Sequence, residues 1–218
     1  MLLSALKLSL LVAGLATVGV AVLGTWSGWL LARRCFRGRE WIDALLNLPL
    51  VLPPTVTGYY LIVLLGRRGW LGEPLYSTTG WSIPFTWFAC VIAAGVMAFP
   101  LMVRAARVAF EELDPRFELA AASLGHGPWS VFFRVVLPLA RRGLAAGLVL
   151  SFARALGEFG ATLMLAGNIP GRTQTLPLAI YEAVMTGEDR TALLLSALLT
   201  AVSVIVIVSA GRLGRRPA

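Results

Sequence analysis

The stretch EELDPRFELAAASLGHGPWSVFFRVVLPLARR, residues 111–142, separates two long apolar segments and decides how the whole chain is interpreted. Asp114 and Pro115 predict the start of a short helix, because Asp is a good N-cap residue and Pro suits the first helical turn. Gly125 predicts the end of that helix, and Pro128 allows a second helix to begin. We therefore expect a bent loop of two short helices between two hydrophobic segments.

Outward from this loop, the chain consists mainly of apolar runs long enough to cross a bilayer, which takes about 20 residues as a helix. Of its 218 residues, 58% are hydrophobic and only 14% are charged, more apolar than is usual for a soluble domain. Helices are favoured because lipid offers backbone groups no partners. We predict an all-α polytopic membrane protein forming one domain over residues 1–218. Its five expected spans are residues 8–32, 44–65, 85–103, 143–166 and 191–211.

The basic residues are distributed unequally between the two sides of these spans. They form short clusters between apolar runs, which is a membrane pattern rather than the basic face of a nucleic-acid-binding domain. The side richer in arginine includes Arg33, Arg34, Arg141 and Arg142. Because positive charge favours the cytoplasm, we expect the loop over residues 111–138 and the C-terminus to be cytoplasmic, and the N-terminus to be outside.

The polar residues are too few for a nucleotide, metal or catalytic site. The only lysine, Lys7, is followed by Leu8 with no glycine-rich turn before it, so the chain has no P-loop. A single histidine, His126, rules out a multi-histidine zinc centre. We expect no catalytic residue, no metal and no cofactor bound by this chain. If ATP drives the protein, another chain must bind it.

The second predicted span carries Pro53 and Pro54, which disturb helical hydrogen bonding. Broken helices are tolerated in a membrane where they are buried in protein or line a cavity. The span is therefore a candidate wall of a transport pathway, with Thr55 and Thr57 as polar lining. A kinked helix that simply packs against its neighbours is an equally open alternative.

The fourth predicted span contains the charged residues Arg154 and Glu158. Four residues apart, they are expected to share a helix face and to pair. Charged groups within a membrane normally face the bundle interior or water. The pair could lie in the pathway, act as a gate, or brace the span. We favour bracing or gating, because a paired arginine offers little net attraction to an anion.

The loop resembles the coupling motif of ABC importer permeases. That motif reads Glu-Ala-Ala, three residues, Gly, nine residues, Ile, any residue, Leu-Pro. Here Leu119 occupies the usual glutamate position and the acid stands one residue earlier. The resemblance implies the type I ABC importer permease fold, with loop helices that fit a groove on an ATPase subunit. The loop residues that it implicates in coupling are Glu118, Ala120, Ala121, Gly125, Pro128, Leu137 and Pro138.

Three further stretches, residues 48–72, 97–107 and 151–181, resemble the molybdate permeases, which are related to the sulfate/thiosulfate permeases. The resemblance implies a subunit of an ATP-driven importer in the prokaryotic plasma (inner) membrane, forming the pathway for molybdate or a similar tetrahedral oxyanion. Tungstate and sulfate or thiosulfate are alternative substrates. A passive channel is less favoured, since it needs no coupling loop.

The same resemblance implies the partners of this chain. They are a second copy in a homodimer, two ABC ATPase subunits that hold ATP and Mg, and an extracytoplasmic oxyanion-binding protein, with lipid around them and no nucleic acid.

Overall fold

The computed structural model describes residues 2–34 and 36–214, which form helices and no strand. The elements are α1 (Leu2–Arg33), α2 (Arg39–Val51), α3 (Pro54–Leu65), α4 (Gly72–Thr79), α5 (Trp87–Glu111), α6 (Arg116–Ser123), α7 (Pro128–Val131), the π-helical segment η1 (Phe132–Val136), α8 (Leu137–Leu156), α9 (Gly160–Ala166), α10 (Leu176–Met185) and α11 (Asp189–Gly214). Four helices in the described part of the chain are long and apolar enough to cross a membrane: Leu3–Arg33, Trp87–Glu111, Pro128–Leu156 and Asp189–Ser209. The all-α fold predicted from the sequence is therefore confirmed.

The predicted span over residues 44–65 is broken in the structure. The chain bends by 116° between helices α2 and α3. The described residues therefore contain five spans only if this bent pair counts as one span. The break falls where Leu52 and Pro53 adopt extended backbone angles. A residue before proline is pushed out of the helical region, and Pro54 then occupies the first turn of a new helix, which explains both sides of the break.

The predicted span over residues 143–166 also differs from the structure. One continuous helix runs from Pro128 through η1 to Leu156, and α9 is a separate helix beyond it. The second helix expected within the loop is thus the beginning of a span. Pro138 explains the π-helical turn, since proline lacks the N–H for an ordinary helical bond. In that turn the Leu137 N–H reaches the Phe132 carbonyl instead.

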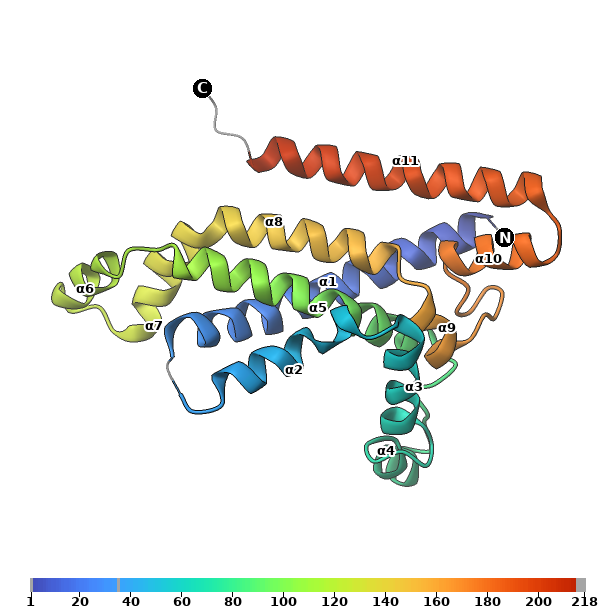
Figure 1. Ribbon diagram of the computed structural model, residues 1–218, viewed down its shortest axis with the longest axis horizontal. Helices are drawn as coiled ribbons and strands as arrows, with labels where there is room; N and C mark the ends of the chain where they lie inside the picture. The colour runs from blue at the N-terminus through green and yellow to red at the C-terminus, as the bar shows by residue number, and fades with distance from the viewer. Residues whose placement is uncertain (1, 35, 215–218) are drawn as a thin grey trace.

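The helices α1, α5 and α8 lie side by side, with α5 the most buried of the three (Figure 1). Small residues let their backbones approach closely. A Cβ added at Gly28 in α1 would lie 2.6 Å from the Ala106 Cβ in α5, and one added at Gly143 in α8 would lie 2.5 Å from the Ala109 Cβ. Close contact of small residues is the usual way in which membrane helices associate.

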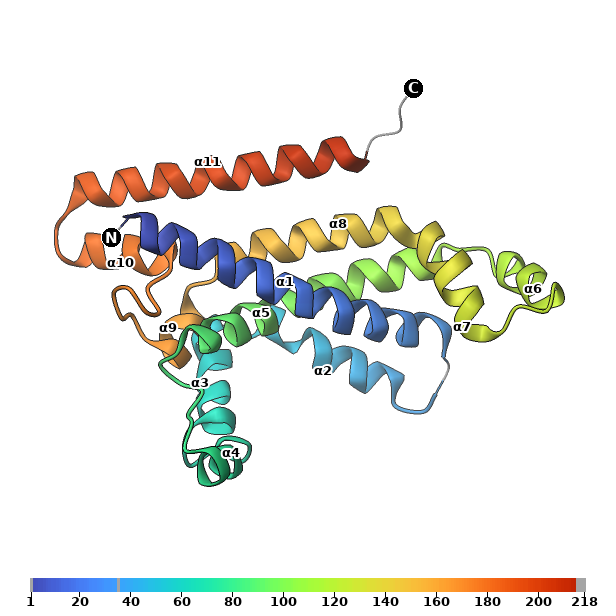
Figure 2. The same cartoon turned by 180° about the vertical axis from the view of Figure 1, so that it is seen from behind.

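The two ends of this bundle differ in character (Figures 1 and 2). Helices α6 and α7 extend beyond one end, and α11 runs toward that end. The N-terminus, α9 and α10 lie at the other end, and α3 with α4 projects sideways from that half. The N-terminus and the α6–α7 loop are therefore on opposite ends of the bundle.

Candidate functional site

The residues from Arg116 to Val131 form a bent protrusion, which we call the knob. The Asp114 carboxylate accepts a hydrogen bond from the Arg116 N–H at 2.9 Å and so begins α6. Gly125 ends it with φ of +83°, a left-handed conformation that glycine adopts without a steric penalty. Pro128 then occupies the first turn of α7. The proline and glycine signals in the sequence thus account for the bend.

The knob exposes three large apolar side chains. Leu119 is 66% exposed, Leu124 80% and Trp129 63%. Large apolar side chains exposed on a protrusion are typical of a protein–protein contact surface. The family motif has a glutamate at this position, so the motif gives no signal for an apolar contact at Leu119. Its exposure makes it a candidate contact residue.

The implicated coupling residues occupy different positions on and below the knob. Ala120, Gly125 and Pro128 are exposed, whereas Ala121 is only 8% exposed and packs inward. Leu137 and Pro138 lie outside the knob, in the first turn of α8 next to η1. The knob therefore gathers five of these seven residues, and the remaining two mark the π-helical turn that joins it to a span.

Glu118 ties the knob to the end of α1. Its Oε1 lies 2.6 Å from the Arg33 Nη2, and the same guanidinium donates a longer bond of 3.5 Å to the Leu113 carbonyl. The acid therefore faces the span rather than the open surface of the knob. In the sequence, both charges stand at the ends of predicted elements, which indicates that each could pair. The sequence does not indicate that the two lie close together in space.

Stacked aromatic rings form a second link between the knob and the spans. Trp129 of α7 stacks on Trp26 of α1 with ring centroids 5.9 Å apart, and Trp29 meets Phe132 edge-on at 5.4 Å. Phe132 also contacts Phe110 of α5, at 6.3 Å. These aromatic contacts hold α7 against α1, and η1 against α1 and α5.

A set of ion pairs clamps α2 onto α5 near the knob. Arg107 lies 2.9 Å from Asp43 and 2.8 Å from Glu111, and Arg39 lies 3.0 Å from Glu111. The Arg104 Nε donates to the Asn47 Oδ1 at 2.5 Å. Only the Arg107–Glu111 pair, four residues apart on one helix, could be expected from local spacing, because the other pairs join residues 57 to 72 positions apart.

The candidate pathway residues lie around the break between α2 and α3. Pro53, Pro54 and Thr55 are exposed, whereas Thr57 is 6% exposed. Helix α3 packs on α9, where a Cβ added at Gly160 would lie 2.9 Å from the Pro54 Cβ. The exposed residues border the break, and Thr57 faces the packed side.

Arg154 and Glu158 form an ion pair at the second break, with 2.6 Å between Nη1 and Oε2. The expectation that they share a helix face needs correction, because α8 ends at Leu156. Glu158 lies beyond the helix end, and its Oε1 accepts the Ala161 N–H of α9 at 2.8 Å. Its side chain is 1% exposed, against 28% for Arg154.

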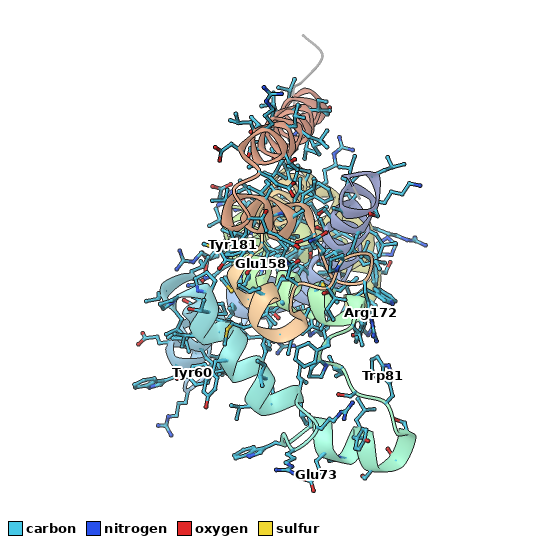
Figure 3. All side chains as sticks on the ribbon, turned by 90° about the vertical axis from the view of Figure 1, so that its right-hand side faces the viewer. Tyr60, Glu73, Trp81, Glu158, Arg172 and Tyr181 are labelled. Carbon is cyan, nitrogen blue, oxygen red and sulfur yellow. The ribbon has the colours of Figure 1, made fainter. Side chains whose placement is uncertain are left out.

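Figure 3 shows Glu158 within this end of the molecule and Tyr60, which is 58% exposed, on its flank. Because α3 packs on α9, the break between α2 and α3 lies next to the break between α8 and α9. In the described residues no group of three His, Cys, Asp or Glu side chains is placed to hold a metal ion.

Apolar spans broken near one end and an exposed knob at the other define the membrane subunit of an ABC importer, and comparison with known proteins bears this out. The chain belongs to the family of binding-protein-dependent transport system inner membrane components, whose model matches residues 20–217. It is therefore a multi-pass inner-membrane transport subunit.

Among its relatives, the molybdenum transport system permease protein ModB of Escherichia coli (strain K12) is 47% identical over 218 residues, which is 98% of this chain and 95% of that protein. The sulfate transport system permease protein CysT of the same strain is 36% identical over 98% of this chain and 78% of its own. In structure, the MetNI methionine ABC transporter matches with a TM-score of 0.76 and 18% identity, over 99% of this chain and 95% of that one. The resemblance drawn from the sequence is thus confirmed for the family and for the fold.

Proposed function

We propose that this chain forms the translocation pathway of an ATP-driven importer that carries molybdate, or a similar tetrahedral oxyanion, into the cell. The observation that carries the proposal is the 47% identity to the molybdenum permease over nearly the whole length of both chains. The lower identity to the sulfate permease makes sulfate the second candidate, and tungstate, which has the same shape and charge as molybdate, the third.

In the proposed assembly two copies of the chain form a homodimer with two ATPase subunits and an extracytoplasmic binding protein. The ATPases bind ATP and Mg, and this chain contributes no catalytic group. The arginine distribution supports a cytoplasmic knob, a cytoplasmic C-terminus and an outer N-terminus. The apolar exposure of Leu119, Leu124 and Trp129 supports a docked ATPase on the knob.

The helix from Pro128 to Leu156 suggests how the knob acts on the pathway. It has 29 residues and is therefore roughly 44 Å long. One of its ends lies in the knob, and the other adjoins the break that holds Arg154 and Glu158. A displacement of the knob by ATPase closure would thus reach the breaks along a single helix, while the Arg33–Glu118 pair moves α1 with it. The same displacement would then reach Pro53, Pro54 and Thr55 at the α2–α3 break, and Thr57 on the packed side of α3.

Tracer uptake by cells that depend on this importer tests substrate and mechanism together. We expect radiolabelled molybdate uptake that requires the ATPase and the binding protein. Tungstate in excess should inhibit it strongly, and sulfate weakly. Stronger inhibition by sulfate than by tungstate would assign the chain to sulfate import, and uptake without the ATPase would indicate a passive channel.

A further inference from the structure

A hollow of about 650 Å³ lies on the half of the molecule that is remote from the knob. Two loops far apart in sequence contribute arginines to it, Arg67 after α3 and Arg172 after α9. Figure 3 shows Arg172 and Trp81, another lining residue, on the same flank of this end.

A tight glycine turn presents Arg67. The Gly69 N–H donates to the Gly66 carbonyl at 2.8 Å, and a Cβ added at Gly66 would lie 2.5 Å from the Ile62 carbonyl oxygen. The Arg67 guanidinium lies over the ring of Tyr76, 5.2 Å from its centroid, in a cation–π contact. Both features hold the guanidinium near the hollow without neutralising it.

An internally bonded loop presents Arg172. The Arg172 N–H donates to the Ile169 carbonyl at 3.0 Å. The neighbouring Thr173 is fully buried, and its hydroxyl donates to the Gly167 carbonyl at 3.1 Å and accepts the Ile169 N–H at 3.0 Å. The backbone around Arg172 is therefore fixed, while its side chain stays exposed at the rim.

The hollow is positively charged and holds no compensating acid. Among the described residues, no ion pair joins Arg67 or Arg172 to a carboxylate, and no Asp or Glu lines the hollow. Ser82 adds a half-buried hydroxyl. By contrast, Arg33, Arg39, Arg107 and Arg154 are each paired with a carboxylate.

Backbone strain marks the same place. Phe85 lines the hollow with φ of +63°, a conformation that is rare for a bulky residue and costs of order 1–3 kcal/mol. Its N–H donates to the Leu165 carbonyl of α9 at 3.2 Å, which helps to hold the strained geometry. Strain of this kind is concentrated at ligand sites and switch regions.

We propose that Arg67, Arg172 and Ser82 form a binding site for a tetrahedral oxyanion at this end of the molecule. Guanidinium forks match the paired oxygens of such an anion, and a hydroxyl can donate to a third. The identification of that anion as transported substrate arriving from outside rests on the proposed function. A phosphate of a lipid headgroup presents the same chemistry and is the other source.

Equilibrium binding to the complete complex in nanodiscs, without the binding protein, tests this site. With phosphatidylcholine as the lipid, we expect Arg67→Gln and Arg172→Gln each to weaken radiolabelled molybdate binding by about tenfold, since hydrogen bonds to charged groups are the strong ones. Arg68→Gln is the matched control, because Arg68 is exposed beside Arg67 but does not line the hollow. Arg67→Lys and Arg172→Lys keep the positive charge, so they should weaken molybdate binding less than the glutamine variants do.

A second arm uses nanodiscs of phosphatidylglycerol. Native mass spectrometry then detects any bound phosphatidylglycerol. Its loss in both glutamine variants, with retention in Arg68→Gln, would support the oxyanion site and identify a lipid headgroup as the source of the anion. Binding of both molybdate and lipid that is unchanged in the glutamine variants would overturn the proposal. The proposed function is tested by a different measurement: it would be wrong if the wild-type complex showed no ATP-dependent molybdate uptake.

Discussion

Arg33, the last residue of α1, and Glu118, in the first turn of α6, lie 2.6 Å apart, so the end of a span and the knob are joined by a charged contact. Both side chains are partly exposed. Pairs of this kind contribute about 0.2–1 kcal/mol, enough to bias a movement without being essential for folding. The contact therefore suits a link that transmits motion.

Glu118→Gln and Arg33→Gln should each lower the number of molybdate ions transported per ATP hydrolysed, by roughly two- to fivefold, in line with a coupling of about 0.5–1 kcal/mol. The double variant should lose no more than either single one, since each removes the same contact. Uptake and ATP hydrolysis measured on one reconstituted preparation check this. Glu112→Gln, an exposed acid nearby, is the control. Fully additive losses would show that the two residues act independently.

Gly125→Val should weaken attachment of the ATPase, while Gly127→Val should not. Gly125 has φ of +83°, and a β-branched residue there would force the bend out of shape at a cost of about 1–2 kcal/mol. Gly127 has extended angles, and an added Cβ would meet no atom within 4 Å. Co-purification of the ATPase with each variant is the measurement. Equal recovery of the ATPase with both variants would show that attachment does not depend on the left-handed backbone at Gly125.

Pro138→Ala should lower coupling while leaving the amount of inserted protein unchanged. Without proline, the π-helical turn at Phe132–Val136 can revert to an ordinary helix, which rotates the knob relative to α8. Pro177→Ala is the matched control, because Pro177 lies outside the knob, in the first turn of α10, where its missing N–H is not needed. The ratio of uptake to ATP hydrolysis distinguishes the two. A normal ratio in Pro138→Ala would make the π-helical turn incidental.

Gly28→Ala should reduce the yield of folded protein, and Gly19→Ala should not. The new Cβ at Gly28 would lie 2.6 Å from the Ala106 Cβ and 2.8 Å from the Arg107 backbone nitrogen, so α1 and α5 must separate. Overpacking of this kind costs about 1–3 kcal/mol. At Gly19 an added Cβ has no neighbour within 4 Å. Size-exclusion profiles and thermal unfolding of both variants in one detergent provide the test, and indistinguishable profiles would contradict the packing.

Glu158→Ala should destabilise the protein by an amount near the lower end of about 3–5 kcal/mol. It leaves the Arg154 charge without its partner and removes the acceptor for the Ala161 N–H. Because Arg154 is 28% exposed, the full penalty is not expected. Arg154→Gln combined with Glu158→Gln should recover much of the thermal stability.

The same variants decide between bracing and a pathway role for this pair. A stable double variant that hydrolyses ATP but does not transport would assign Arg154 and Glu158 to the pathway. Wild-type stability in Glu158→Ala would exclude the bracing role.

How far the sequence predicts this molecule depends on whether the signal is local. The proline at position 54 and the glycine at position 125 constrain the backbone directly, so a break and a bend could be expected there. The end of α8 could not, because Gly157 is one glycine among many and the apolar run continues past it.

The contacts across the fold were harder still to predict. Arg33 and Glu118 are 85 positions apart, and Arg67 and Arg172 are 105 apart, so no helical or strand period relates them. Their proximity depends on how the spans pack. Ala121 illustrates the same limit, since the motif identified the residue while only the packing reveals that it faces inward.

The most direct test of the central claim is molybdate uptake into proteoliposomes that contain this chain and its ATPase, with the binding protein outside and ATP trapped inside. We expect uptake that requires both ATP and the binding protein. Equal uptake with and without ATP, or ATP-driven uptake of sulfate but not of molybdate, would contradict it.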